Sequence, residues 1–447
     1  MRKLLLHLFA FSVLLAGCQK VENSTEAEVK VLPTEQSPRL TYQEAAAVAQ
    51  KSIGWLEQNT KTRGKRGART INHANTKAVV GDATRSGGEA DTLMYVFNFA
   101  NNEGFAMVAT ARDSEQLIAV TEQGNYTPGV ETENEGFNMF ARAAEEYVST
   151  LAITPGPNYP DPNGPFYKIE TQESQAATGP LLETKWEQKG IYGSLCPNIP
   201  YGVAGCVAIA MAQILVHHQY PASIALTYPN APTSSLTLDW EGIELHTKTG
   251  FCSCGADSIA IHNQIAHLCR ELGERVNMNY YDEGFNDKGE YVNPKSNAYS
   301  STVPSALSGL GYSSNSSLIA YDLQTICSNI DGGKPVYMDG RRYTNEAETE
   351  TRGHAWLIDG YMIVTTSCIT YISPVSINGP WRIDNVTNSY AYYAHCNWGW
   401  NGTYNGYFSN GVFNIANAYQ YDESHSIDHD FHYKCNLQMI TNITPNI

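Results

Sequence analysis

The sequence predicts an α+β protein of two domains, in which a small α+β domain precedes a larger one with a helical half and an antiparallel β half. The chain has 447 residues, more than one ordinary hydrophobic core organises. A stretch rich in proline and glycine, residues 154–165, permits neither a helix nor a central strand and separates the two domains. Beyond it, apolar residues recur first at helical spacing and later in short aromatic strands between glycine and asparagine turns.

The first residues have the pattern of an export signal. Two basic residues precede an apolar run at 4–15, which is too short to span a bilayer but suits the core of a signal peptide. The run ends in LAGC at 15–18, which resembles the bacterial lipobox. We expect residues 1–17 to be a lipoprotein signal peptide, Cys18 to be lipidated and residues 18–40 to form a polar tether. The alternative is an ordinary signal peptide with an incidental cysteine.

The first domain is expected at residues 41–170. Strong helix formers with a helical apolar pattern predict a helix at 42–56. Three strand-like runs follow within 91–126, and the first two flank an Asn-Asn-Glu-Gly turn typical of a hairpin. A second helix is predicted at 141–151, which completes a compact α+β unit.

Composition and cysteine count restrict the class of protein. The formal net charge of −16 argues against nucleic acid or an anionic membrane surface as the main partner. Ten cysteines are present, and setting Cys18 aside leaves an odd number. In an exported protein an odd count suggests one free thiol. The remaining cysteines could form up to four disulfides or stay reduced and buried.

The second domain is expected at residues 171–447, and its most informative residue is Cys206. It follows Gly205 at the start of a predicted helix whose apolar residues recur at helical spacing. A thiol at a helix N-terminus lies near the positive end of the helix dipole, which favours the nucleophilic thiolate. The alternative is a small buried core residue. A polar irregular region at 221–254 and a helix at 257–272 are expected next.

Three further residues follow a chemical order around this cysteine. Gln188 lies in a Trp-Glu-Gln sequence, His354 in Gly-His-Ala-Trp, and Asn397 in Asn-Trp-Gly-Trp. A cysteine nucleophile needs an imidazole as general base and acid, an acceptor that orients the imidazole, and a donor for the developing oxyanion. Each residue also has an ordinary interpretation: His354 as a buried hydrogen-bonded histidine, Asn397 as a turn residue and Gln188 as a surface residue.

Together these motifs resemble the streptopain family of papain-like cysteine peptidases. The resemblance covers residues from about 180 to the C-terminal region, and residues from about 40 to 170 are similar to that family's inhibitory pro-domain. It implies a papain-like two-lobed catalytic domain, with a helical lobe and an antiparallel β lobe, after a small α+β pro-domain. The resemblance assigns five catalytic-site roles: Cys206 as nucleophile, His354 as general base and acid, Gln188 as oxyanion donor, Asn397 as orienter of the histidine, and Trp398 as a shield over that contact.

The same resemblance indicates substrate-binding residues but no metal or cofactor. Asp339, in Pro-Val-Tyr-Met-Asp-Gly, stands where the streptococcal member has glutamine and is expected to line a substrate subsite with Gly353 and Ala355. Two adjacent histidines, His217 and His218, invite a metal interpretation. Neighbouring helical residues point in different directions and no acidic partner is obvious, so we expect no metal site.

We therefore expect an inactive precursor of a cysteine endopeptidase, held in the cell envelope by a lipid anchor unless maturation releases it. Its partners would be protein or peptide substrates and its own pro-domain, and not nucleic acid. Maturation would cleave a flexible stretch at about 155–179. Two rivals remain: a transglutaminase-type acyl transferase, which uses a similar cysteine–histidine pair, and a catalytically inert surface-binding lipoprotein.

Overall fold

The computed structural model describes residues 37–59, 68–81, 91–151, 166–249, 256–285, 291–343, 351–373, 380–416 and 435–447. The expected signal peptide and Cys18 lie outside these residues. The described chain divides into two compact units. Residues 166–174, 365–373 and 380–389 form one unit, here called the hairpin arm, and all other described residues form the body.

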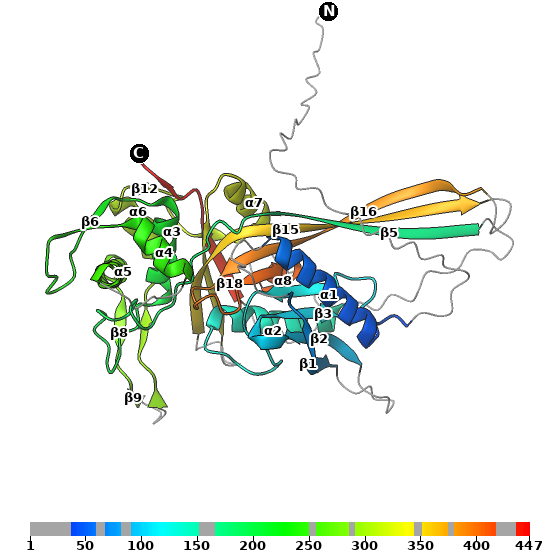
Figure 1. The fold of residues 1–447 in the computed structure, drawn as a ribbon, viewed down its shortest axis with the longest axis horizontal. Coiled ribbons are helices and arrows are strands. Elements are labelled where there is room, and N and C mark those ends of the chain that lie inside the picture. Colours follow the sequence, from blue (N-terminus) through cyan, green and yellow to red (C-terminus); the bar gives the residue numbers. More distant parts are fainter. Residues whose placement is uncertain are drawn as a thin grey trace, which may run out of the picture. The chain divides into compact units, whose positions relative to one another are not determined.

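The N-terminal domain of the body is a four-stranded antiparallel sheet between two helices (Figure 1). Its elements are α1 Tyr42–Asn59, β1 Ile71–Val80, β2 Thr92–Phe99, β3 Phe105–Ala109, β4 Leu117–Thr121 and α2 Glu135–Thr150, with a 3₁₀ turn at Ala100–Asn102. The α1 helix packs on one face of β2–β4 and α2 on the other, so the sheet is buried on both sides. The expected helix at 42–56 and the three strands are confirmed, whereas α2 begins six residues before the expected start and β1 was not predicted.

The helical half of the body is organised around α3 Cys206–His218, whose residues 207–216 are all buried. The other helices are α4 Trp240–Thr249, α5 Ala256–Arg275 and α6 Val303–Gly309 after a 3₁₀ turn at Ser300–Thr302. The helix α7 Leu323–Asp331 packs in the other core, which contains α2. Short strand pairs connect them: β6 Ser223–Ala225 with β7 Ser235–Thr237, β8 Asn279–Tyr281 with β11 Lys295–Asn297, β9 Gly284–Phe285 with β10 Tyr291–Val292, and β12 Tyr312–Ser313 with β19 Thr444–Pro445. The α5 helix confirms the expected one, while α4 lies in the region expected to be irregular.

The β half consists of long antiparallel strands. They are β14 Val336–Tyr343, β15 Thr351–Ser373, β16 Arg382–Asn397, β17 Gly406–Ser409 and β18 Cys435–Ile440, with β13 Ile319–Ala320 at the edge and α8 Asn410–Ala416 after β17. Among the described residues the sheet runs β1-β2-β3-β4-β17-β16-β15-β14-β18-β13. The sheet of the N-terminal domain therefore continues into that of the second domain.

The joint between the two domains is the antiparallel pair β4–β17. Val120 lies opposite Tyr407, with Thr121 and Ala119 paired on either side of it. Backbone hydrogen bonds across a strand edge depend little on side-chain identity, so the edge of β17 positions the whole N-terminal domain.

The strands β14 and β15 have two differently occupied faces. Because successive residues of a strand point to opposite faces, Ala355 and Leu357 pack in the core that contains α3. Trp356 and Ile358 pack in the core that contains α2. The register places Gly340 opposite His354 and Asp339 opposite Ala355. This sheet thus separates the helical half from the N-terminal helix α2.

The stretch expected to be flexible is in part a strand. Residues Phe166–Thr178 form β5, which pairs with β15. Strand pairing fixes the backbone of this segment, which contradicts a flexible connection over its whole length. The rest of the expected cleavage stretch lies outside the described residues.

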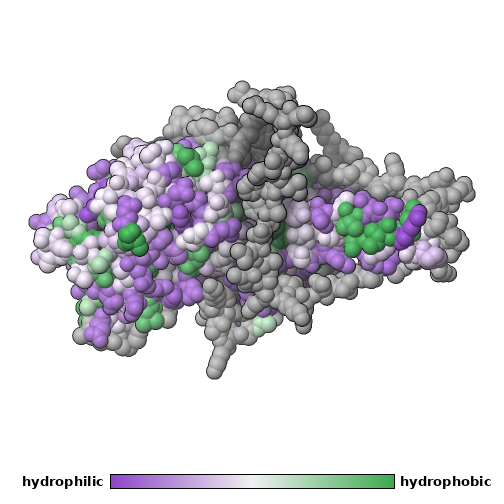
Figure 2. All heavy atoms as spheres, turned by 90° about the horizontal axis from the view of Figure 1, so that it is seen from above, coloured by the Kyte–Doolittle hydropathy of each residue, from purple (hydrophilic) through white to green (hydrophobic). Residues whose placement is uncertain are grey.

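The hairpin arm consists of the outer parts of β5, β15 and β16, and it has exposed apolar side chains on its surface (Figure 2). The exposed apolar residues of the arm include Ile169, Ile383 and Val386. Its internal contacts include a hydrogen bond from Tyr371 to Glu170, at 2.9 Å. No helix in the described part of the chain is long and apolar enough to cross a membrane.

Six cysteines of the described residues are free thiols: Cys196, Cys206, Cys269, Cys327, Cys368 and Cys396. Three of these, Cys196, Cys269 and Cys396, are buried. A framework of four disulfides is therefore excluded: all six of these cysteines are reduced, and three of them are buried as the alternative expected.

Candidate active site

Cys206 begins α3, as expected. Its N-cap residue Gly205 has φ of 88°, a left-handed conformation that favours glycine. A Cβ on Gly205 would also lie 2.6 Å from Cε of Met278. The backbone amides of Cys206, Val207 and Ala355 donate hydrogen bonds to the thiol. The turn at Gly205 thus aims the thiol at the start of the helix, beside β15.

The expected activation of this thiol is not present in the structure. Burial raises the pKa of Cys206 to about 11, and the carboxylate of Asp339 adds to the rise. The three amides lower the pKa, but their effect is smaller than the cost of placing a thiolate away from water. The expectation of a stabilised thiolate is therefore wrong for this state of the chain.

His354 lies near the start of β15 and is only 4% exposed. Its Nε2 is 2.8 Å from the backbone carbonyl oxygen of Trp398. A carbonyl oxygen can only accept, so Nε2 carries the proton. Burial lowers the pKa of His354 to about 4, against the opposing effects of the Trp398 carbonyl and Glu135. The imidazole is therefore neutral near pH 7 and its Nε2–H is already used.

The sheet keeps the thiol and the imidazole on different sides. His354 stacks on Trp356, with ring centroids 6.3 Å apart and planes at 11°, and so shares the face that packs on α2. Cys206 packs against the core of the opposite face. Among the described residues no hydrogen bond joins the two side chains. A thiolate–imidazolium pair cannot form until one of them moves.

The start of α2 occupies the space beside His354. A Cβ built on Gly136 would lie 2.6 Å from Cδ2 of His354 and 2.7 Å from Cε3 of Trp398. The helix start itself is fixed by Asn134, whose Oδ1 accepts from the amide of Phe137 at 3.0 Å. The N-terminal domain therefore presents a rigid helix end to the histidine.

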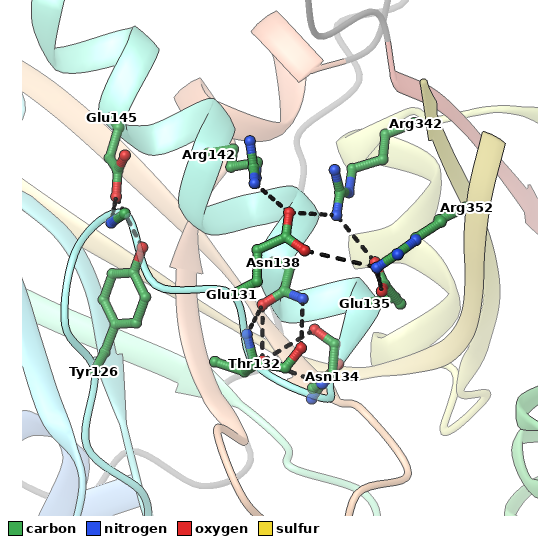
Figure 3. A network of polar contacts seen from close by, with 11 residues as sticks. Tyr126, Glu131, Thr132, Asn134, Glu135, Asn138, Arg142, Glu145, Arg342 and Arg352 are labelled. Carbon is green, nitrogen blue, oxygen red and sulfur yellow. Dashed lines mark hydrogen bonds and ion pairs between the residues drawn. The ribbon is translucent and has the colours of Figure 1, made fainter. Parts of the chain in front are cut away.

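A network of ion pairs surrounds this contact (Figure 3). Arg342 Nη2 donates to Glu131 at 3.0 Å and to Glu135 at 3.1 Å. Arg352 donates to the other oxygen of Glu135 at 2.8 Å, and Arg142 also binds Glu131. The two glutamates belong to the N-terminal domain, and Arg342 and Arg352 lie opposite each other on β14 and β15. The glutamates neutralise two like charges that would otherwise repel across the strand pair.

The other expected catalytic residues lie near the same region, but in different contacts from those expected. The Asn397 side chain donates to the carbonyl of Thr184 at 3.3 Å and accepts from the amide of Gly399 at 3.3 Å, not from His354. The backbone carbonyl of Gln188 accepts from Ala204 at 2.8 Å, which ties the Gln188 segment to the turn before Cys206.

Trp398 is fully buried, packs on Trp356 with ring centroids 5.1 Å apart, and donates from Nε1 to the carbonyl of Tyr404 at 2.9 Å. Its backbone carbonyl holds His354. The orienting, oxyanion and shielding roles of Asn397, Gln188 and Trp398 remain predictions for an assembled site.

Of the expected substrate-binding residues, Asp339 and Ala355 lie on the Cys206 face of the sheet. Asp339 is 6% exposed, accepts a hydrogen bond from Ser300 and forms an ion pair with Arg341 at 3.4 Å. Burial raises the pKa of this carboxyl. Gly353 is exposed at the start of β15. Their roles in substrate binding remain predictions.

The sequence interpretation did not find the groups packed beside His354 or the ion pairs around them. Gly136 and the two glutamates lie within residues 131–136, whereas the two arginines lie on β14 and β15, about 200 positions later, and no local pattern connects the two segments. Adjacent His217 and His218 bind no common group: Nε2 of His217 contacts the carbonyl of Gly333 at 2.8 Å. Within the described residues no cluster of three metal-ligating side chains occurs.

A helix-terminal cysteine, a histidine on the neighbouring strand and an N-terminal domain that keeps them apart define the precursor of a cysteine peptidase. Comparison with known families agrees with this class. Residues 186–408 match the peptidase C10 family, and residues 37–148 match the Spi protease inhibitor family. The chain belongs to the C10 or streptopain family of cysteine peptidases, in its zymogen form.

Individual relatives are more distant. The thiol protease/hemagglutinin PrtT of Porphyromonas gingivalis is 24% identical over 344 residues, which cover 71% of this chain and 34% of PrtT. The chain thus spans about a third of the length of that relative. A prointerpain A fragment from Prevotella intermedia matches with a TM-score of 0.47 and 22% identity, covering 83% of this chain and 98% of that one. Active interpain A matches with a TM-score of 0.36 and 23% identity over 64% of this chain and 98% of that one.

Proposed function

We propose that this chain is a self-processing precursor, and that its mature form hydrolyses peptide bonds in exposed or unfolded protein segments. The observation that supports it is the separation of Cys206 and His354 by β15, with α2 of the pro-domain against the histidine. Once α2 leaves, His354 is free to turn from the Trp398 carbonyl toward the thiol. The imidazole can then take the thiol proton and later give it to the leaving amine.

Two features supply the chemistry of the assembled site. The amides of Cys206 and Val207 at the start of α3 can serve a thiolate or an oxyanion, with Gln188 as an added donor. Asp339 and Ala355 lie beside the thiol on the face that a substrate would reach. A cleft that binds mainly the substrate backbone accepts varied sequences, so we propose proteins rather than one small molecule as substrates.

Export and lipid anchoring through Cys18 are part of the proposal. Their support is the apolar run at 4–15 and the LAGC sequence that ends it. Lipidation at Cys18 can be tested in a Gram-negative host grown with a clickable fatty acid. The host expresses either the full chain or a Cys18→Ser variant. Labelling of the parent and not of the variant is expected; equal labelling would contradict lipidation at Cys18.

Purified full-length protein tests the peptidase assignment. We expect it to shorten with time by loss of its pro-domain, while Cys206→Ala stays full length. The matched control is Cys327→Ala, which removes another partly buried free thiol on α7 and should process normally. If the purified Cys206→Ala variant lost its pro-domain with no other protease present, the mechanism would be contradicted. With a protein substrate, release of new amino termini without cross-linked product separates hydrolysis from acyl transfer.

A further inference from the structure

His395 lies between two carboxylates, one from each domain. It is 2% exposed and lies on β16. Its Nδ1 is 2.6 Å from Oδ1 of Asp359, a fully buried residue of β15. Its Nε2 is 3.2 Å from Oε1 of Glu122. Glu122 belongs to the pro-domain, so this imidazole bridges the inhibitor and the catalytic domain.

The geometry requires a charged ring. An ionised carboxylate only accepts hydrogen bonds, and a neutral imidazole has a single N–H. Two carboxylate contacts on the two ring nitrogens are therefore satisfied only by imidazolium. The two carboxylates raise the pKa of His395 to about 10 against the opposing effect of burial. Burial opposes ionisation of Glu122, but the same contact, with Arg69 and Lys185 nearby, outweighs it and lowers the pKa of Glu122.

The position of Glu122 ties this contact to domain docking. Glu122 directly follows β4, and its amide donates to the carbonyl of Asn405 at 2.8 Å, next to the β4–β17 pair. Arg69 of the pro-domain donates to the Glu122 carbonyl at 3.2 Å. The carboxylate thus crosses the domain boundary at the end of the shared strand pair.

The other carboxylate connects to the frame of the active site. Oδ2 of Asp359 accepts from the amide of Leu182 at 3.1 Å, and the Asp359 carbonyl accepts from the amide of Leu181 at 2.7 Å. Asp359 shares β15 with His354, and His395 shares β16 with Asn397. Leu181 and Leu182 lead into the segment of Gln188. One ionic cluster therefore contacts the three segments that bear the expected catalytic partners.

We propose that His395 is a positioning residue, a buried imidazolium through which Glu122 latches the pro-domain to the strands of the active site. The proposal rests on the proposed function in that the latched state is the inactive precursor. It is not a second catalytic dyad, because both ring nitrogens are occupied by carboxylates. Release of the pro-domain removes Glu122 and leaves His395 with Asp359 alone.

The charges around the ring set the direction of pH dependence. Besides the two carboxylates, the ring meets Tyr407 of β17, with ring centroids 4.9 Å apart, and Cys396 follows it in the chain. Loss of Glu122 removes one cause of the raised pKa, so protonation of His395 favours the docked state. Docking weakens as pH rises from the pKa that His395 has after release of the pro-domain toward its docked pKa of about 10. On the acid side, docking weakens as Glu122 is protonated below its ordinary range.

A second buried group at the same interface acts in the same direction. Glu115 of the pro-domain accepts from Ser409 of β17 at 3.0 Å, and Tyr393 of β16 and Tyr147 of α2 also face this carboxyl. Burial raises the pKa of Glu115 to about 7. Glu115 therefore weakens docking as pH rises from the ordinary pKa of a glutamate through about 7. Both groups disfavour docking as pH rises, Glu115 up to about pH 7 and His395 up to about pH 10.

The test uses the full chain with Cys206→Ala, which cannot process itself. Amide hydrogen exchange of β4, β17 and residues 355–359 is followed between pH 5 and 9 and corrected for the intrinsic pH dependence of exchange. We expect opening to increase with pH, and the added Glu122→Gln substitution to speed it about tenfold or more at pH 6 in all three segments. Glu133→Gln is the matched control, because it removes an exposed interdomain ion pair with Lys189 and should change little.

A second measurement reports the ring directly. In histidine-labelled protein, nuclear magnetic resonance should show the His395 ring protonated at pH 8, with a lower pKa in the Glu122→Gln variant. Titration of His395 near its ordinary pKa, or equal exchange in the Glu122→Gln and Glu133→Gln variants, would overturn the latch. Neither readout needs peptidase activity, so absence of processing in the parent chain would contradict the proposed function and leave this result intact.

Discussion

Gly136 of the pro-domain lies against His354 so closely that the glycine has no space for a side chain. Cβ of an alanine there would be 2.6 Å from Cδ2 of the imidazole, well inside contact distance. The pro-domain thus fills the space beside the histidine.

Gly136→Ala should therefore loosen the zymogen. Alanine normally favours a helix by about 0.5–1 kcal/mol over glycine, but here the clash forces α2 away from His354. We expect a net loss of about 1–3 kcal/mol in unfolding free energy and faster self-processing, measured by denaturation and by gel time course. The control is Gly54→Ala in α1, where a Cβ would meet no atom within 4 Å beyond its chain neighbours and its own helix backbone; it should stabilise the chain and leave processing unchanged. Slower processing of Gly136→Ala would contradict this role.

The two arginines of the network should contribute unequally. The side chain of Arg342 is 2% exposed and holds both glutamates, whereas that of Arg352 is 55% exposed. Arg342→Gln removes the buried guanidinium that joins Glu131 to Glu135, while Arg142 and Arg352 still contact these carboxylates; losing its charged hydrogen bonds costs about 1–3 kcal/mol. Arg352→Gln should cost about 1 kcal/mol or less because water screens the pair. Unfolding curves and processing rates at low and high salt measure this, and equal effects of the two variants would contradict it.

Cys206 should react slowly while the pro-domain is docked. With a pKa raised to about 11, its thiolate fraction near pH 7 is about a hundredfold below that of an ordinary cysteine. In a His354→Ala chain, which cannot mature, iodoacetamide labelling of Cys206 followed by mass spectrometry should be slow at pH 7 and rise through pH 10. Labelling at pH 7 as fast as that of a denatured control would show that the thiol is not suppressed.

The sequence predicts those parts of the fold that depend on residues close together in the chain, and misses those that depend on distant contacts. The helices α1, α3 and α5 have apolar residues at helical spacing, so the sequence indicates them directly. The polar strand β1 lacks an alternating pattern, and only its pairing with β2 makes it a strand. The α4 helix was missed because its sequence mixes polar residues with few apolar ones.

The active site likewise has features that local motifs predict and features that depend on distant segments. Cys206 and its helix, His354 and Asn397 are recognisable from local motifs. The raised pKa of the thiol was not predictable, because burial by distant segments outweighs the local amides. Glu122 and His395 are 273 positions apart, and only the tertiary fold brings them together. The inhibited state therefore depends mainly on contacts that no local pattern records.

Asn397 should contact His354 only after maturation, and a substitution can test this. In the zymogen its side chain holds the carbonyl of Thr184 and the amide of Gly399. If Asn397 orients the imidazole in the mature enzyme, Asn397→Asp places a carboxylate beside the ring and raises the pKa of the imidazolium. The active thiolate–imidazolium pair would then persist to higher pH. We expect the alkaline limb of kcat/KM against pH, measured with a peptide substrate, to move upward; an unchanged limb with lowered kcat would mean that Asn397 supports the backbone and does not orient His354.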